Sequence, residues 1–148
     1  VTAYGKTKLH GEQGIEANMD EYYIFRSAWL YGVGGSNFVK TMTKLGSTRD
    51  ELNVVADQVG SPTYTVDLAK LLVDMVNTDK YGIYHATNEG FCNWYEFACE
   101  IFKQAGVSVE VAPVTSDQYP AKAKRPFNSR MSKDKLVENG FERLPDWQ

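Results

Sequence analysis

The sequence has 148 residues, of which 43% are hydrophobic and 24% charged, and its 16 basic and 19 acidic side chains give a formal net charge of −3. This length allows one domain with a sizeable core, and the composition disfavours disorder and a generally cationic nucleic-acid binder. No run of about 18 apolar residues and no charged-then-apolar leader is present, so we expect a cytoplasmic globule without a membrane span or secretory signal.

Helices and strands are predicted to alternate in the first part of the chain. A helix-compatible stretch runs to Asn18 and is followed by the uniformly apolar run 22–31, typical of a buried parallel strand that ends at a group of glycines. Helical spacing returns over 37–45, and a short strand is predicted at 52–55.

The same alternation continues to the end of the chain. A tight turn at 60–62 leads to Thr65, a candidate N-cap for a helix that runs to Val76. Strand 82–86 follows, and Asn93 with Glu96 indicates a capping box for a helix that stops at Gly106. Residues 107–114 alternate like a strand, and 132–139 favour a short helix. The order predicts an α/β fold in one compact unit.

Tyr4 and Lys8 form the first candidate catalytic pair. They are four residues apart, so on a helix both side chains project from one face, one turn apart. A lysine ammonium near a phenol favours the phenolate, and such a pair can exchange a proton with a carbonyl near neutral pH. The alternative is an ordinary exposed helix face, because this spacing is common by chance in a chain rich in tyrosine and lysine.

The letters around this pair resemble the active-site helix of extended short-chain dehydrogenases/reductases that act on nucleotide sugars. Within them, the chain is similar to the dTDP-4-dehydrorhamnose reductase family through ordered segments that span nearly its whole length: Tyr4-Gly5-Lys6-Thr7-Lys8-Leu9-x-Gly11-Glu12, Arg26-Ser27-Ala28-Trp29-Leu30-Tyr31-Gly32, Asn37-Phe38-Val39-Lys40-Thr41-Met42, Asp57-Gln58-Val59-Gly60-Ser61-Pro62-Thr63, Gly82-Ile83-Tyr84-His85, Trp94-Tyr95-Glu96-Phe97-Ala98 and Arg125-Pro126-x-x-Ser129. The resemblance implies that about 1–35 hold the active-site helix and last parallel strand of a Rossmann-like fold. It implies that about 36–148 bind the nucleotide sugar.

By this resemblance, Tyr4 donates a proton to the C4 keto oxygen of the sugar while hydride arrives from NADPH or NADH. Lys8 would bind the nicotinamide ribose, so both residues would touch the cofactor. The implied reaction converts dTDP-4-dehydro-L-rhamnose to dTDP-L-rhamnose for bacterial surface polysaccharides. The implied substrate is a dTDP-linked deoxyhexose, the complete protein is expected to form a homodimer, and no nucleic acid or membrane is an expected partner.

Two parts of the family pattern are missing from these residues. The family's catalytic Ser or Thr stands roughly two dozen residues before the tyrosine, but only three residues precede Tyr4. No Gly-x-x-Gly-x-x-Gly follows a strand, although such a turn holds the dinucleotide pyrophosphate. We therefore expect a carboxy-terminal portion that lacks the amino-terminal Rossmann half and is inactive by itself.

Three further residues are predicted to bind substrate. Trp29 follows the apolar strand at the edge where ligands of open α/β sheets bind, and an indole can lie against a hexose. The alternative is a core tryptophan. Asn37 and Phe38 read by themselves as a helix cap and a core residue, whereas the resemblance makes them the start of the segment that lines the nucleotide-sugar cleft.

Six cations gather within fourteen residues near the end of the chain: Lys122, Lys124, Arg125, Arg130, Lys133 and Lys135. Such an excess is often a solvated face, but it also suits the diphosphate of a nucleotide sugar, for which Arg125 and Arg130 would supply bidentate donors. His10, His85, Cys92 and Cys99 lack metal-ligand spacing, so no metal site is predicted. The two cysteines are expected to pack as small apolar groups on one helix.

Two other functions stay open. A non-catalytic relative, such as the regulatory subunit of methionine adenosyltransferase, shares the implied fold and acts as a binding partner. Another nucleotide-sugar epimerase or dehydratase of the superfamily is the second alternative, although the Trp29 and 60–63 segments match the reductases better.

Overall fold

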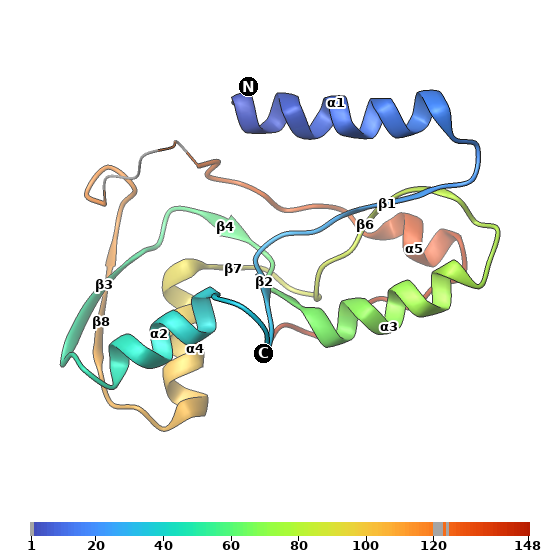
Figure 1. Ribbon diagram of the computed structural model, residues 1–148. Coiled ribbons are helices and arrows are strands. Elements are labelled where there is room, and N and C mark those ends of the chain that lie inside the picture. The colour runs from blue at the N-terminus through green and yellow to red at the C-terminus, as the bar shows by residue number, and fades with distance from the viewer. Residues whose placement is uncertain (1, 120–122, 124) are drawn as a thin grey trace.

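The chain alternates between helices and strands, which confirms the predicted α/β class (Figure 1). The computed structural model describes residues 2–119, 123 and 125–148. Its elements in chain order are α1 (Ala3–Asn18), β1 (Tyr23–Arg26), β2 (Leu30–Tyr31), α2 (Phe38–Gly46), β3 (Glu51–Val55), β4 (Val59–Gly60), β5 (Thr63–Tyr64), α3 (Thr65–Val76), β6 (Gly82–His85), β7 (Cys92–Asn93), α4 (Trp94–Ala105), β8 (Glu110–Val114) and α5 (Asp134–Glu138).

The strands pair across long stretches of sequence. β1 pairs with β6, β2 with β5 and β3 with β8, all in parallel, whereas β4 and β7 are antiparallel. In Figure 1, α2 and α4 lie beside the β3–β8 pair, and α3 and α5 lie near β1 and β6. Parallel strands need long crossover connections, so this arrangement follows from the alternation of helices and strands in the sequence.

Two hydrophobic cores hold these groups of elements together. The first joins α2, α4 and β3 and is formed by Met42, Leu52, Val54, Cys92, Phe97, Ala98, Ile101 and Phe102. The second joins α3 and β6 to the end of the chain and is formed by Leu71, Met75, Tyr84, Ala86, Leu136 and Leu144. The two helices predicted to end at Val76 and at Gly106, α3 and α4, each contribute to one of these cores.

The predicted strand over 22–31 is wrong in its extent. β1 ends at Arg26, and β2 belongs to a different sheet. Between them Trp29 has a φ of 50°, a left-handed conformation that non-glycine residues seldom adopt. The bend is held by Thr63, whose N–H donates to the Trp29 carbonyl and whose hydroxyl donates to that of Ala28. Tertiary contacts therefore override a continuous apolar run.

Smaller differences concern the ends of elements. Tyr64, not Thr65, occupies the N-cap of α3, and no side chain caps this helix. Thr65 instead lies against Gly32, where any Cβ would collide with its side chain. The strand predicted at 107–114 begins at Glu110, and the helix predicted at 132–139 covers Asp134–Glu138.

Other helix ends are as predicted. The Asn37 side chain accepts from the Lys40 N–H at the start of α2. At α4 the Glu96 N–H donates to Asn93 and the Asn93 N–H donates to Glu96, both at 2.8 Å, which completes the capping box. Gly106 ends α4 with a φ of 64°.

The capping box of α4 leads to a stability prediction. We expect Asn93→Ala to lower the free energy of unfolding by about 1 kcal/mol. The Glu96 N–H loses its acceptor, and the Glu96 side chain that accepts from the N–H of residue 93 loses its reciprocal contact. Urea denaturation measures this change. Asn93→Asp keeps an acceptor at the N-cap and serves as the control, so equal destabilisation by both variants would contradict the capping argument.

Helix α1 stands apart from both cores. It contains no buried residue, and in Figure 1 it runs along one edge of the molecule. Its start is capped by Thr2, whose hydroxyl accepts from the Gly5 N–H. No helix within the described ranges is both long enough and apolar enough to cross a bilayer.

Candidate functional site

Tyr4 and Lys8 both lie on α1, so the predicted pair shares one helix face. The Tyr4 side chain is prominent at the surface, with 73% of the residue exposed, and Lys8 is exposed too. Neither the Tyr4 hydroxyl nor the Lys8 ammonium has a hydrogen-bond partner among residues 2–119, 123 and 125–148. Both groups are therefore free to meet a ligand.

Trp29 belongs to an aromatic group that continues into the first core. Its indole stacks on that of Trp94, with ring centroids 3.7 Å apart, and the Phe38 ring centroid lies 4.7 Å from that of Trp94. Gly60 approaches the Trp29 ring so closely that a Cβ there would lie 2.9 Å from two indole carbons. This close approach gives the glycine in the 57–63 segment a packing reason beyond a simple turn.

A pocket opens beside this aromatic group. It has a volume of about 210 Å³ and is lined by Phe38, Met42, Asn53, Val54, Val55, Gln58, Trp94, Tyr119 and Arg125. Two predicted substrate residues, Phe38 and Arg125, thus meet in one cavity. Aromatic walls with one guanidinium suit a ligand that combines a flat ring with an anionic group.

Contacts between two loops fix one wall of this pocket. Ser116 donates from its N–H and its hydroxyl to the Asp57 carboxylate, at 2.9 and 2.5 Å. These hydrogen bonds lower the pKa of Asp57. Gln58, which lines the pocket, donates to the Ser116 hydroxyl at 2.9 Å. The segment 57–58 therefore has a definite structural role, that of joining the loop after β3 to the loop after β8.

The described members of the basic cluster lie in different surroundings. The Arg130 guanidinium lies over the Phe91 ring and donates to Asn128, outside the pocket that holds Arg125. Lys135 lies over the Tyr84 ring. Lys122 and Lys124 fall outside the described residues.

Lys133 differs most clearly from the expectation of a solvated surface cation. Its side chain is only 3% exposed, and its ammonium lies 3.2 Å from the Glu89 carboxylate. The ammonium also donates to the Thr87 hydroxyl and the Asn88 carbonyl. These partners make Lys133 a buried structural cation, so it cannot join a diphosphate site without leaving them.

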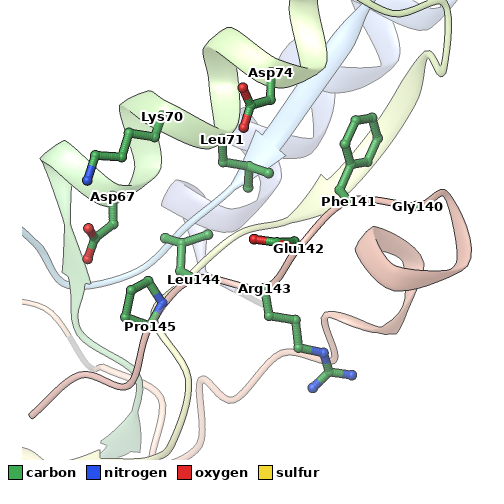
Figure 2. Close-up of a pocket in the computed structure, with 10 residues that line it drawn as sticks. All are labelled: Asp67, Lys70, Leu71, Asp74, Gly140, Phe141, Glu142, Arg143, Leu144 and Pro145. Carbon is green, nitrogen blue, oxygen red and sulfur yellow. The ribbon is translucent and has the colours of Figure 1, made fainter.

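A second pocket lies between α3 and the segment that follows α5 (Figure 2). It is lined by Asp67, Lys70, Leu71, Asp74, Gly140, Phe141, Glu142, Arg143, Leu144 and Pro145, none of which is a predicted site residue. Figure 2 shows the Arg143 side chain directed away from α3. Arg143 instead pairs with Glu89 and Asp134, so this pocket presents mainly carboxylates.

Cys92 and Cys99 are free, but they do not share a helix as predicted. Cys92 lies on β7 and Cys99 on α4. Burial raises the pKa of the Cys92 thiol to about 12, so this thiol stays protonated and packs as an apolar group. Within the ranges that the structure describes, no three His, Cys, Asp or Glu side chains gather where they could hold a metal ion.

The sequence reasoning missed several residues of the aromatic pocket. Trp94 was noted only as part of a motif, yet its ring stacks on the Trp29 indole and also contacts the Phe38 ring. Gln58 and Tyr119 come from loops and are 61 positions apart in the sequence. No spacing rule connects these positions, because only the β3–β8 pairing brings the loops together.

Comparisons with known proteins give a consistent result. A family profile described as the RmlD substrate binding domain matches residues 1–148. The spore coat polysaccharide biosynthesis protein SpsK of Bacillus subtilis is 45% identical over 95% of this chain and 49% of its own.

Two solved structures of proteins named dTDP-4-dehydrorhamnose reductase are also similar. The one from Clostridium acetobutylicum superposes with a TM-score of 0.95 at 49% identity, over 99% of this chain and 52% of its own. The one from Bacillus anthracis, in complex with NADP, has a TM-score of 0.93 at 45% identity, over 97% of this chain and 51% of its own. The chain spans about half the length of the curated relatives it matches.

Proposed function

The chain belongs to the family of the RmlD substrate binding domain, and from this we propose that it is the nucleotide-sugar-binding part of a dTDP-4-dehydrorhamnose reductase. The complete enzyme would reduce the C4 keto group of dTDP-4-dehydro-L-rhamnose with NADPH or NADH. The observation that carries the proposal is the Tyr4–Lys8 pair on α1 of a chain whose relatives include reductases. Both side chains are exposed, and neither has a hydrogen-bond partner in the described part of the chain.

The proposed substrate site is the aromatic pocket. Phe38 and Trp94 offer ring faces for the thymine base, and Arg125 offers a guanidinium for the diphosphate. Trp29 stacks on Trp94 and, in this proposal, contacts the sugar with the part of its ring that Trp94 does not cover. Asn37 sets the start of α2 and so places Phe38. Arg130 stays a prediction as a second diphosphate ligand.

The functional groups of Tyr4 and Lys8 are of types that can bind a nicotinamide cofactor. A free hydroxyl and a free ammonium on one helix face can both reach the ribose of a dinucleotide that lies along that face. When bound, the cofactor supplies the hydride. Tyr4 then gives its proton to the carbonyl oxygen, and Lys8 holds the ribose. A cytoplasmic location, expected from the sequence pattern, and a homodimer of the complete protein, implied by the resemblance, stay predictions.

Nucleotide binding by the 148-residue chain tests the proposed pocket. We expect dTDP to bind in a calorimetric titration, and Arg125→Ala to weaken that binding about tenfold or more, because a hydrogen bond to a charged group is lost. Lys135→Ala removes a cation outside the pocket and is the matched control. Undetectable dTDP binding, or equal binding by the Arg125 variant, would contradict the assignment.

Catalysis is tested in a joined protein, defined as these 148 residues fused to the unmatched part of the Clostridium acetobutylicum relative. We expect the joined protein to oxidise NADPH when dTDP-4-dehydro-L-rhamnose is added. If it binds both ligands and does not oxidise NADPH, the proposed reaction is wrong.

A further inference from the structure

We propose that Glu12, Arg26 and His85 form a positioning unit that sets how the Tyr4–Lys8 face of α1 meets the substrate-binding part of the chain. The inference rests on the proposed function, because the face that is positioned is the one assigned to proton transfer. None of the three residues is assigned a contact with substrate or cofactor.

Glu12 continues the catalytic face by one more helical turn. Tyr4, Lys8 and Glu12 follow each other at intervals of four residues on α1, so their side chains form one stripe. A contact at Glu12 therefore fixes the rotation of the helix about its own axis. If the helix rotated by one residue position, the Tyr4 hydroxyl would move by about 100° around the helix axis.

The contact at Glu12 is bidentate. The Arg26 Nε donates to Glu12 Oε1 at 2.8 Å, and the Arg26 Nη2 donates to Glu12 Oε2. Two parallel bonds between a planar guanidinium and a carboxylate define an orientation, which a single lysine contact would not. The hydrogen bonds and the charge of Arg26 also lower the pKa of Glu12, so the carboxylate is ionised at neutral pH.

His85 extends this contact into the rest of the chain. It is the register partner of Arg26 in the β1–β6 pair, and its Nε2 lies 3.5 Å from Arg26 Nη1. Its Nδ1 is 2.8 Å from the Ser132 carbonyl, which can only accept, so Nδ1 carries the proton and Nε2 faces the guanidinium as an acceptor. The unit thus connects α1 through both strands to the segment just before α5.

Among the described residues, few other contacts orient α1. The helix has no buried residue, and its other side-chain hydrogen bond to a residue beyond its end, within the described part of the chain, is the 3.3 Å contact from Tyr22 to Glu16. Tyr22 lies in the short connection after α1, so this contact does not link the helix to the rest of the chain. In the described residues, orientation relative to the substrate pocket therefore depends on Glu12.

Hydrogen exchange of the 148-residue chain measures the positioning directly. We expect Glu12→Gln to speed exchange of the α1 amides roughly three- to tenfold, because a charged bidentate contact is lost at a partly exposed site. Glu16→Gln is the matched control on the same helix and should leave the exchange of residues 3–12 close to that of the unaltered chain. Equal exchange in both variants would overturn the inference.

Kinetics of the joined protein separate positioning from simple stability. We expect Glu12→Gln to lower kcat about 10- to 100-fold while KM for the nucleotide sugar changes less than about threefold, because the substrate pocket is intact and the proton donor is misplaced. The reversed pair, Glu12→Arg with Arg26→Glu, should recover a substantial part of kcat. A loss carried by KM alone, or no recovery by the reversed pair, would overturn the inference.

The two proposals fail in different ways. If the unaltered joined protein binds its ligands without turnover, the proposed function is wrong, and the positioning role in catalysis falls with it. If the unaltered protein is active and Glu12→Gln matches Glu16→Gln in both exchange and kcat, the reductase assignment stands and only the positioning unit is wrong.

Discussion

Tyr4→Phe should reduce turnover of the joined protein by about 10²- to 10⁴-fold, the usual contribution of a positioned proton donor. The variant loses one hydroxyl on an exposed helix that has no buried residue, so the fold has no reason to change. The ring remains, and the substrate pocket around Phe38 and Trp94 lies on other elements. We therefore expect the loss in kcat, measured as NADPH oxidation, with little change in KM for the nucleotide sugar.

Tyr22→Phe is the matched control for this experiment. It also removes one phenolic hydroxyl, which donates to Glu16 near the end of α1. Turnover of the control should stay close to that of the unaltered joined protein. Near-normal NADPH oxidation by Tyr4→Phe would show that another group donates the proton.

Glu89→Gln should destabilise the 148-residue chain by about 3 kcal/mol, at the lower end of the range for a broken buried ion pair. The Lys133 side chain is 3% exposed and Glu89 is 30% exposed, so the lysine stays buried when its counter-charge is removed. The Thr87 hydroxyl and the Asn88 carbonyl still accept from the ammonium, which keeps the loss moderate. Urea denaturation gives the change in free energy of unfolding.

A second substitution tests the cause of this loss. In the double variant Glu89→Gln and Lys133→Met, the buried charge is gone and an apolar chain of similar length fills its space, so most of the stability should return. Failure of Lys133→Met to restore stability would mean that Glu89 acts through its second partner, Arg143.

Local sequence signals predicted the helices well. Asn37, Asn93 and Gly106 were recognised as helix ends because each cap is a contact between residues three or four positions apart or a conformation that one residue type favours. The Tyr4–Lys8 face also needed nothing more than helical periodicity. Thr65 was misplaced by one residue, because β5 runs directly into α3 and the threonine packs on Gly32.

The candidate site was predictable only in part. Phe38 and Arg125 were named from the sequence and meet in one pocket, whereas Arg130 does not line it. Charge density along the chain cannot reveal that Lys133 is buried against Glu89, since the two are 44 positions apart. The aromatic neighbour Trp94 was missed as a pocket residue for the same reason.

The sequence alone determined the α/β class, the helix caps, the shared face of Tyr4 and Lys8 and the family resemblance, because these depend on periodicity and on motifs of adjacent residues. The tertiary structure decided the bend at Trp29, the burial of Lys133, the aromatic pocket and the Glu12–Arg26–His85 contact. Each of these joins residues that are distant in sequence, and their proximity is set by strand pairing and core packing, which no local pattern encodes.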